Sequence, residues 1–249
     1  MMKIVAKTDI GKARNENQDN YRAGRQSDDT VWAVVCDGMG GARGGAFASS
    51  MAVTAFEAEF VKGLVPGLPA AGVRSLMETA ANRANHEIYE LAQQDEDKHG
   101  MGTTLVALVL KDGLAHIIHA GDSRAYLYRD GWLERLTRDH SMVQELVENG
   151  SLTPEEAEVH PNKNLITRAV GVGPELAVEY SERQMRPEDT LLLCSDGLTN
   201  AVTEEELSEI IKQSDFFDTA SAMVQQALAA GGKDNITAVL VQVDATKEQ

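Results

Sequence analysis

Residues 31–41 read VWAVVCDGMGG, and the other motifs of the chain can be compared with this stretch. Its first six residues are apolar and rich in β-branched side chains, which predicts a strand buried on both faces. Asp37 follows at the end of this strand, and the glycines after it allow backbone or a ligand to approach closely. An Asp-Gly pair after a strand is more often a simple turn, so Asp37 alone is weak evidence for a metal ligand.

The same arrangement recurs in three other places. Residues 191–197 read LLLCSDG and residues 115–124 read AHIIHAGDSR, so Asp196 and Asp122 each follow an apolar strand. Asp234 stands instead just before an apolar strand over 236–241. Four carboxylates therefore lie at strand ends beside small residues, and this recurrence makes all four candidate metal ligands.

Length and charge limit the possible partners. With 249 residues, 43% of them hydrophobic, the chain can bury a large core and lies near the upper size for one domain, so we expect a single domain over 1–249. The formal net charge of −16 favours solubility and argues against nucleic acid or an anionic membrane as partner. A bound phosphate would need local positive charge from cations or from Arg.

The cysteines and the N-terminus indicate the compartment. Cys36 and Cys194 both lie in apolar strands, and we expect reduced thiols because nothing in the sequence indicates export. The N-terminus lacks the apolar core of a signal peptide, and no run approaches the roughly 18 apolar residues of a membrane span. We therefore expect a cytoplasmic protein that is not inserted in a membrane. We also expect it to be a monomer.

Helices and strands come in blocks. Apolar residues at helical spacing predict two long helices, over 42–62 and 73–91. A run of strands follows, over 103–110, 114–120, 125–128 and 132–136. The Asp-Gly turns at 112–113 and 130–131 predict tight hairpins within this run. A doubly wound fold would alternate strand and helix, so the order favours antiparallel sheets.

Both ends of the chain supply further elements. Residues 3–8 are predicted as an opening strand, followed by a polar loop over 9–20 that carries Arg14. Later strands are predicted over 176–183, 190–194 and 236–243, with helices beginning after Thr203 and covering 217–228.

Residues 139–173 interrupt the strands with short helices. An apolar stripe from Val143 to Val147 stops at Asn149-Gly150, and Thr153-Pro154 supplies a helix cap and a first-turn proline. A small polar insertion between sheet strands is more often a flap beside a site than a second domain. We expect a flap subdomain over about 139–173.

The carboxylates point to one kind of chemistry. Asp-only ligation favours Mg²⁺ or Mn²⁺ over Zn²⁺, and no alternating-acid loop of a calcium sensor is present. Two such ions about 4 Å apart can hold a bridging water, lower its pKa and direct it at phosphorus. A guanidinium such as that of Arg14 binds phosphate oxygens through paired hydrogen bonds. The residues thus predict metal-assisted hydrolysis of a phosphoester.

The ordered motifs also resemble a known family. The chain is similar over nearly its whole length to the metal-dependent protein phosphatases of type 2C, specifically their compact bacterial branch. The similarity is carried by RNENQD (14–19), DGMGG (37–41), GTT (102–104), GDSRAY (121–126), SDGL (195–198) and DNIT (234–237).

The resemblance implies a fold and an activity. It implies an α+β fold, a four-layer αββα sandwich of two antiparallel sheets flanked by helix pairs, with a small flap that touches substrate. It also implies hydrolysis of phosphoserine and phosphothreonine in proteins. Many bacterial relatives oppose a Ser/Thr kinase, so the expected partners are phosphoproteins, including such a kinase and its substrates.

The resemblance further assigns roles by position. Asp37 would bridge two Mn²⁺ or Mg²⁺ ions, and the Gly38 carbonyl would bind one of them. Asp196 and Asp234 would bind the other, and Asp122 with Asp196 would hold a third, weaker ion. The remaining assigned residues are Arg14, which would bind substrate phosphate, and Asp19, which would orient metal-bound water.

Two positions depart from the family pattern. Animal relatives have His, proposed as the acid for the leaving group, where this chain has Met39, a residue that bacterial members often share. The proton donor is then a metal-bound water, or a flap histidine, His140 or His160, although a lone His is more often structural. Gln18 stands where many relatives have Glu, which alters one contact outside the metal ligands.

Two rival functions can be compared with this one. Residues 38–44 resemble a dinucleotide-binding fingerprint, but the expected acid, Glu57 or Glu59, falls in a helical stretch, and no P-loop Lys follows. A catalytically dead relative that binds phosphoproteins would have lost metal acids, and all of them are present here. Metal-dependent turnover of p-nitrophenyl phosphate separates both rivals from an active phosphatase.

Overall fold

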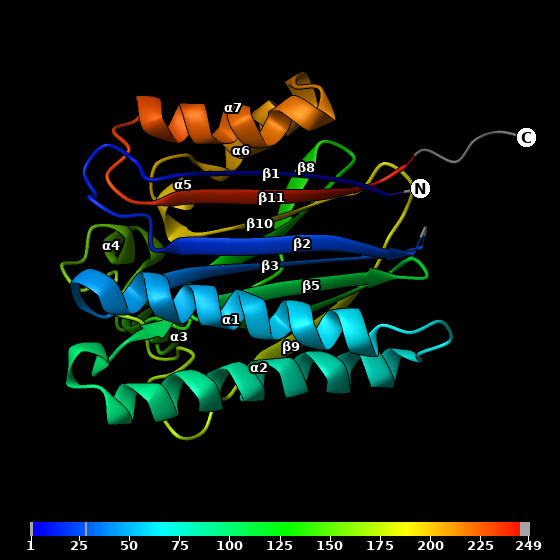
Figure 1. Cartoon of the computed structure of the whole chain (residues 1–249). Coiled ribbons are helices and arrows are strands. Elements are labelled where there is room, and N and C mark those ends of the chain that lie inside the picture. Colours follow the sequence, from blue (N-terminus) through cyan, green and yellow to red (C-terminus); the bar gives the residue numbers. More distant parts are fainter. Residues whose placement is uncertain (1, 28, 245–249) are drawn as a thin grey trace, which may run out of the picture.

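Two antiparallel sheets stack face to face, and helices cover the outer side of each (Figure 1). The computed structural model describes residues 2–27 and 29–244, with only the backbone described at 41–43. The predicted domain ends, residues 1 and 245–249, and residue 28 within the domain lie outside this range. The layers follow the order helices, sheet, sheet, helices, as predicted.

One sheet contains both ends of the described chain. Its strand order is β1-β11-β10-β7-β8, and every pairing in it is antiparallel. The strands are β1 (Met2–Asp9), β7 (Arg124–Arg129), β8 (Trp132–Arg135), β10 (Thr190–Cys194) and β11 (Ile236–Val243).

The other sheet is built around the stretch that opened the sequence analysis. Its order is β2-β3-β5-β6-β9, with β4 pairing to the end of β3. The strands are β2 (Asp19–Ser27), β3 (Thr30–Met39), β4 (Gly102–Thr103), β5 (Leu105–Lys111), β6 (Leu114–Ala120) and β9 (Glu179–Gln184). All pairings between the described strands are antiparallel, which excludes the parallel sheet that a dinucleotide-binding fold requires.

The helices form a pair over one sheet and a group over the other (Figure 1). The pair, α1 and α2, packs on the β3 sheet, while α5, α6 and α7 cover the β11 sheet. The helices are α1 (Gly41–Gly63), α2 (Ala70–Gln94), α3 (Met142–Glu148), α4 (Pro154–Glu158), α5 (Asp196–Thr199), α6 (Glu204–Gln213) and α7 (Phe216–Ala229), with a 3₁₀ turn, η1, at Glu96–Lys98.

Strand β3 is buried on both faces because it separates two cores. Trp32 and Val34 face α1 and α2, whereas Val31, Ala33 and Val35 face the other sheet. The apolar run without polar alternation is therefore explained: neither face of β3 meets water. Burial of this length of chain fixes the position of the residues that follow it, beginning with Asp37.

The predicted run of strands divides between the sheets. Strands β5 and β6 form a hairpin through Asp112-Gly113, and β7 and β8 form one through Asp130-Gly131, all four turn residues having positive φ. This is the conformation that such two-residue hairpin loops require. The chain crosses from one sheet to the other between β6 and β7, so Asp122 lies in the crossover.

One strand was missed by the sequence analysis. Residues 19–27, partly assigned to a loop, form β2 at the edge of the β3 sheet. The sequence DNYRAGRQS lacks the apolar alternation of a half-buried strand, since most of it is only partly buried. Strand β9 also begins at Glu179, later than the predicted residue 176.

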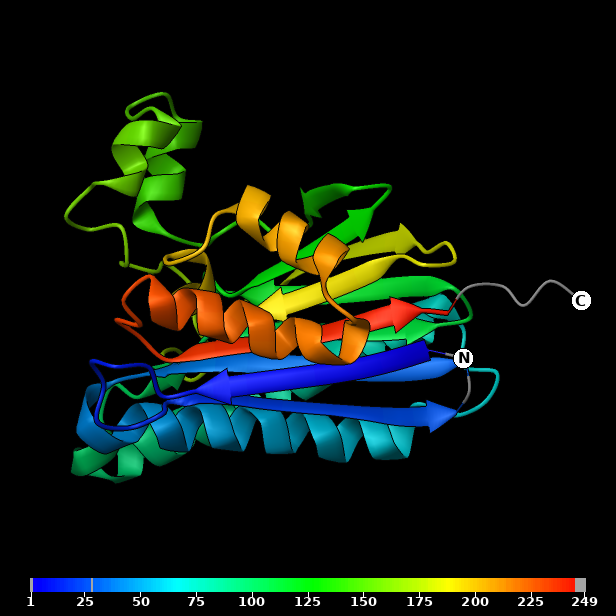
Figure 2. The same cartoon turned by 90° about the horizontal axis from the view of Figure 1, so that it is seen from above.

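Helices α3 and α4 lie between β8 and β9 and project from one end of the sandwich (Figure 2). Helix α3 is capped by Ser141, and α4 begins with the predicted capping box of Thr153 and Glu156. Helix α3 ends at Glu148 and is followed by Asn149 as its C-cap, where the sequence indicated that the apolar stripe stops.

Two further observations concern the cysteines and the length of the helices. Cys36 and Cys194 are free and buried, as expected. Within the described residues, no helix combines the length and apolarity needed to cross a bilayer.

Candidate metal centre

The acids singled out in the sequence lie at one end of both sheets. Asp19 opens β2 and pairs in register with Asp37 on β3. Asp196 follows β10, and Asp234 precedes β11, the strand beside β10. Because the sheets stack, strand ends that are distant in sequence meet at this edge.

All the predicted site residues except Asp19 line one pocket of about 640 Å³. The polar wall contains Arg14, Asp37, Asp122, Asp196 and Asp234. Asn164 and Ile166, which follow α4 in the chain, also line this pocket. The sequence analysis therefore selected residues that the fold brings together, and its segment 139–173 contributes to the same pocket.

The backbone of Asp37 is held by hydrogen bonds to Thr103 on β4 and to Thr104, which lies between β4 and β5. Its backbone N–H donates to Thr104 Oγ1 at 2.9 Å, and its carbonyl accepts from the Thr104 N–H at 2.8 Å and from Thr103 Oγ1 at 2.8 Å. Gly38 N–H donates to the Gln18 carbonyl at 3.1 Å. The backbone is therefore fixed on both sides of Asp37, which lines the pocket.

Gly38 is required by close backbone packing. A Cβ at this position would lie 2.0 Å from the Gly45 carbonyl oxygen on α1, far inside van der Waals contact. The glycine thus lets β3 and α1 approach beside Asp37.

Asp19 is almost fully buried behind the pocket wall. Its Oδ2 accepts hydrogen bonds from Ser195 Oγ at 2.6 Å and from Thr237 Oγ1 at 2.7 Å. No protein donor among the described residues reaches Oδ1, and the same holds for Asp196 Oδ1, whose other oxygen accepts from Asn200. Buried carboxylate oxygens without donors are expected where a cation or water completes the site.

Arg14 and Asp234 form an ion pair at the pocket rim. Arg14 Nη2 donates to Asp234 Oδ2 at 2.7 Å, and Arg14 is half exposed. Asn235 anchors the loop that carries Arg14: its Nδ2 donates to the carbonyls of Ile10 and Glu16, and its Oδ1 accepts from Gln18 N–H. The guanidinium is therefore held at the edge of the acid cluster.

The clustered carboxyls affect each other's protonation. Burial raises the pKa of Asp37 well above its usual range, and the neighbouring Asp19 raises it further. Burial also raises the pKa of Asp19 to about 7 and that of Asp122 to about 7, with Asp196 contributing to both. For Asp196, burial again raises the pKa, followed by Asp234. The protein alone thus opposes full ionisation, and positive charge in the pocket would favour it.

We expect the metal-free protein to lose stability as the pH rises. Asp19 and Asp122 have a usual pKa of 3.8 and a folded-state pKa of about 7, so the folded protein binds their protons more tightly than the unfolded chain does. Their contribution is complete below about pH 4 and is lost as the pH rises through about 7. Urea unfolding in EDTA at pH 5.5 and 8 measures this change.

Two comparisons test that expectation. Mn²⁺ should stabilise the protein more at pH 8 than at pH 5.5, because cations bind the ionised carboxylates. The Asp122→Asn variant should show a smaller loss between the two pH values. A free energy of unfolding that increases with pH in EDTA would contradict the expectation.

The sequence analysis missed the residues that position the acids. Thr104, Ser195, Thr237 and Asn235 had been noted only as parts of motifs. The available signal was their place directly beside an Asp or at the end of a buried strand, where a hydroxyl or amide satisfies neighbouring backbone. Neither His140 nor His160 is among the described residues that line the pocket, whereas Met39 is.

Comparison with known proteins agrees with this geometry. The sequence profile described as protein phosphatase 2C matches residues 12–241. This chain belongs to the protein phosphatase 2C family. The predicted family and class of activity, a phosphatase acting on phosphoproteins, are thereby confirmed.

Individual relatives cover almost the full length of this phosphatase. The serine/threonine phosphatase Stp of Listeria monocytogenes is 39% identical over 97% of this chain and 96% of its own. The solved serine/threonine phosphatase of S. agalactiae has a TM-score of 0.92 at 35% identity, covering 98% of this chain and all of that one. The catalytic domain of PstP, solved with two manganese ions, has a TM-score of 0.86 at 34% identity, with 98% and 99% covered.

Proposed function

We propose that this phosphatase hydrolyses phosphoserine and phosphothreonine in proteins with Mn²⁺ or Mg²⁺ at the acid-lined pocket. Asp37, the Gly38 carbonyl, Asp196 and Asp234 would hold two ions, and Asp122 with Asp196 a third, weaker one. The observation that carries the proposal is the convergence of acids from separate strand ends in one pocket of a protein phosphatase 2C chain.

The donor set suits such cations. Carboxylate and carbonyl oxygens are the ligands of Mg²⁺ and Mn²⁺, and Asp196 Oδ1 is buried without a hydrogen-bond donor in the described part of the protein. Burial, and after it repulsion between the acids, raises the pKa of Asp37 and of Asp196, and bound cations would favour the ionised carboxylates. When bound, the ions supply a Lewis acid that polarises phosphoryl oxygens and lowers the pKa of water. PstP, a relative of the same fold, was solved with two manganese ions.

Arg14 would bind and orient the phosphate. Its guanidinium lies at the pocket rim, 2.7 Å from Asp234, where it can exchange this carboxylate for phosphate oxygens of the substrate. A planar guanidinium fixes the rotation of the phosphate as well as neutralising charge. The loop contacts of Asn235 keep it near the carboxylates while it changes partner.

Asp19 would orient the attacking water and receive its proton. Ser195 and Thr237 hold Oδ2, so Oδ1 is the atom through which Asp19 can accept a hydrogen bond from water. Because both hydroxyls fix the carboxyl plane, the direction of Oδ1 is set before substrate arrives.

The macromolecular substrate would reach the pocket beside residues 139–173. Asn164 and Ile166 line the same pocket as Arg14, so the peptide around a phosphorylated residue would contact this flap. We further propose that the substrates include a Ser/Thr kinase and the proteins that it phosphorylates. A panel of phosphoproteins from the source cell, with its kinases included, would identify them.

Metal removal tests the proposed function. We expect turnover of p-nitrophenyl phosphate and of a phosphothreonine peptide with Mn²⁺, loss of both in excess EDTA, and recovery when Mn²⁺ is restored. A rate that persists in EDTA would contradict the metal requirement. Tight binding of phosphopeptides without turnover would favour the dead relative considered above.

A further inference from the structure

The flap is closed at its base by a short antiparallel neck, residues 140–142 and 165–168. Thr167 N–H donates to the His140 carbonyl at 2.7 Å, and Met142 N–H donates to the Leu165 carbonyl at 2.9 Å. Ser141 and Ile166 form a β-bridge between the two sides. The neck also contains Ile166, which lines the pocket, so its position affects the pocket directly.

His140 joins this neck to the loop that carries Asp122. Its backbone N–H donates to the Gly121 carbonyl at 2.9 Å, and its side-chain Nδ1 accepts from the Gly121 N–H at 3.2 Å. Gly121 directly precedes Asp122 and has a φ of +105°, a conformation that favours glycine. The reciprocal pair therefore fixes the backbone from which the Asp122 carboxylate extends.

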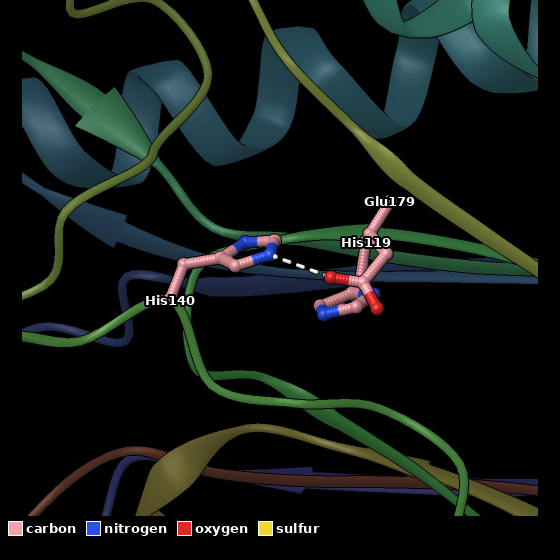
Figure 3. Close-up of side chains that lie close together, drawn as sticks. All are labelled: His119, His140 and Glu179. Atoms are coloured by element: carbon pink, nitrogen blue, oxygen red, sulfur yellow. Dashed lines mark hydrogen bonds and ion pairs between the residues drawn. The ribbon is translucent and has the colours of Figure 1, made fainter. Parts of the chain in front are cut away.

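The opposite ring nitrogen of His140 contacts two further groups. Nε2 lies 3.3 Å from Glu179 Oε2, at the start of β9 (Figure 3), and 3.3 Å from Arg168 Nη1 on the returning side of the neck. The two ring nitrogens of His140 thus face different structures: Nδ1 faces the Asp122 loop, and Nε2 faces the flap neck and β9.

The protonation of His140 follows from these contacts. Burial, together with the stacked ring of His119 4.5 Å away, lowers the pKa of His140 to about 4, so the imidazole is neutral near pH 7. Since Nδ1 accepts from Gly121, the proton lies on Nε2 and is donated to Glu179. Each nitrogen has one defined role.

A metal ion at this cluster is disfavoured by the same hydrogen bonds. One nitrogen each of His119 and His140 and an oxygen of Glu179 lie within 4.8 Å of one another, and these residue types suit Zn²⁺. However, Nε2 of His140 carries a proton while Nδ1 is bonded to Gly121, and the Arg168 guanidinium lies beside Nε2. A cation could bind His140 only by displacing the Nε2 proton or by breaking the Nδ1 hydrogen bond to Gly121. At Nε2 it would also lie beside the positively charged guanidinium of Arg168.

We propose that His140 is a positioning residue that couples the flap to the Asp122 loop, so that substrate contact at the flap and cation affinity at Asp122 depend on one imidazole. This inference rests on the proposed function, because it takes Asp122 as a cation ligand and the flap as a substrate contact. Residues that orient ligands from behind affect metal affinity by about 10–100-fold.

Two conservative variants separate the two roles. His140→Asn keeps an oxygen near the Nδ1 position and can still accept from Gly121, whereas His140→Gln keeps a donor near the Nε2 position and can still reach Glu179. We expect the Asn variant to retain the affinity of the weakest Mn²⁺ site but to raise the KM of a phosphothreonine peptide about tenfold. We expect the Gln variant to lower that Mn²⁺ affinity about tenfold with little change in peptide KM. Calorimetric titration measures the Mn²⁺ affinity, and steady-state kinetics measure the KM of the peptide.

His116→Asn is the matched control. His116 is a buried histidine on β6 that is hydrogen-bonded to Tyr180, and within the described residues none of its hydrogen bonds or ion pairs reaches the neck or the Asp122 loop. This variant should lower thermal stability without changing the Mn²⁺ affinity or the KM of the peptide. The KM for p-nitrophenyl phosphate, which lacks the peptide that would contact the flap, should stay constant in all three variants.

The outcomes are distinguishable. If both His140 variants lose both properties alike, or keep both, His140 only fills space and the inference is overturned while the proposed function stands. If the wild-type protein shows no Mn²⁺-dependent turnover at all, the proposed function and this inference fail together.

Discussion

Asp196→Asn should abolish turnover, with a loss of at least about 10³-fold in kcat/KM. Asp196 is the carboxylate that the proposed ligand set places between ions, its Oδ1 is buried, and Asp234 lies close enough to raise its pKa. An amide keeps the shape of the side chain but removes the charge, so the repulsion falls while cation affinity is lost. Steady-state kinetics with p-nitrophenyl phosphate and Mn²⁺ measure the loss.

Asp122→Asn is the matched comparison for that variant. Asp122 lies in the crossover between the sheets on the same pocket wall, and burial raises its pKa too. It should leave the first two ions bound and lower the rate only in part. Calorimetric titration that gives the same number of Mn²⁺ sites in wild type and in both variants would refute the assignment.

Gly38→Ala should have the second largest effect. The added methyl would lie 2.0 Å from the Gly45 carbonyl oxygen and 2.8 Å from the Gln18 carbonyl oxygen, and both neighbours are backbone. Strand β3 and helix α1 must therefore separate beside Asp37. Overpacking of this kind costs about 1–3 kcal/mol of stability. A displacement of about 1 Å in catalytic groups costs about 10²-fold in rate.

Gly173→Ala provides the control for this substitution. A Cβ there would lie 3.7 Å from the Glu175 carbonyl oxygen, an ordinary contact. It should change neither the melting temperature nor the rate by a measurable amount. Equal activity of the Gly38→Ala and Gly173→Ala enzymes would show that the approach of α1 to β3 does not matter for the site.

Local sequence patterns predicted the acid cluster because each acid lies next to an apolar run that predicts a strand. Asp37 and Asp196 follow runs of buried apolar residues that form strands; β10 ends at Cys194, before Asp196, whereas β3 continues through Asp37 to Met39. The two Asp-Gly hairpins were predictable for the same reason, since their turn type needs positive φ at both residues.

The partition of strands between sheets was not predictable from local signals. Hairpins β5–β6 and β7–β8 look alike in sequence, yet they belong to different sheets because the chain crosses at residues 121–123. Strand β2 was missed since it lies at a sheet edge, where few of its side chains are buried.

The contacts that orient the acids also depend on long-range packing. Ser195 and Thr237 reach Asp19 across 176 and 218 residues of sequence, and no local pattern encodes those hydrogen bonds. The same applies to His140, whose partners Gly121 and Glu179 come from the crossover after β6 and from β9. The residue types indicated the chemistry of the site. Only the fold showed which side-chain atoms of Asp19 and His140 are fixed by hydrogen bonds.

A crystal soaked in MnCl₂ and measured by anomalous scattering tests the central claim most directly. The account predicts at least two manganese peaks within coordination distance of Asp37, Asp196 and Asp234, and a weaker peak beside Asp122. Manganese absent from these carboxylates, or bound instead between His119, His140 and Glu179, would contradict it.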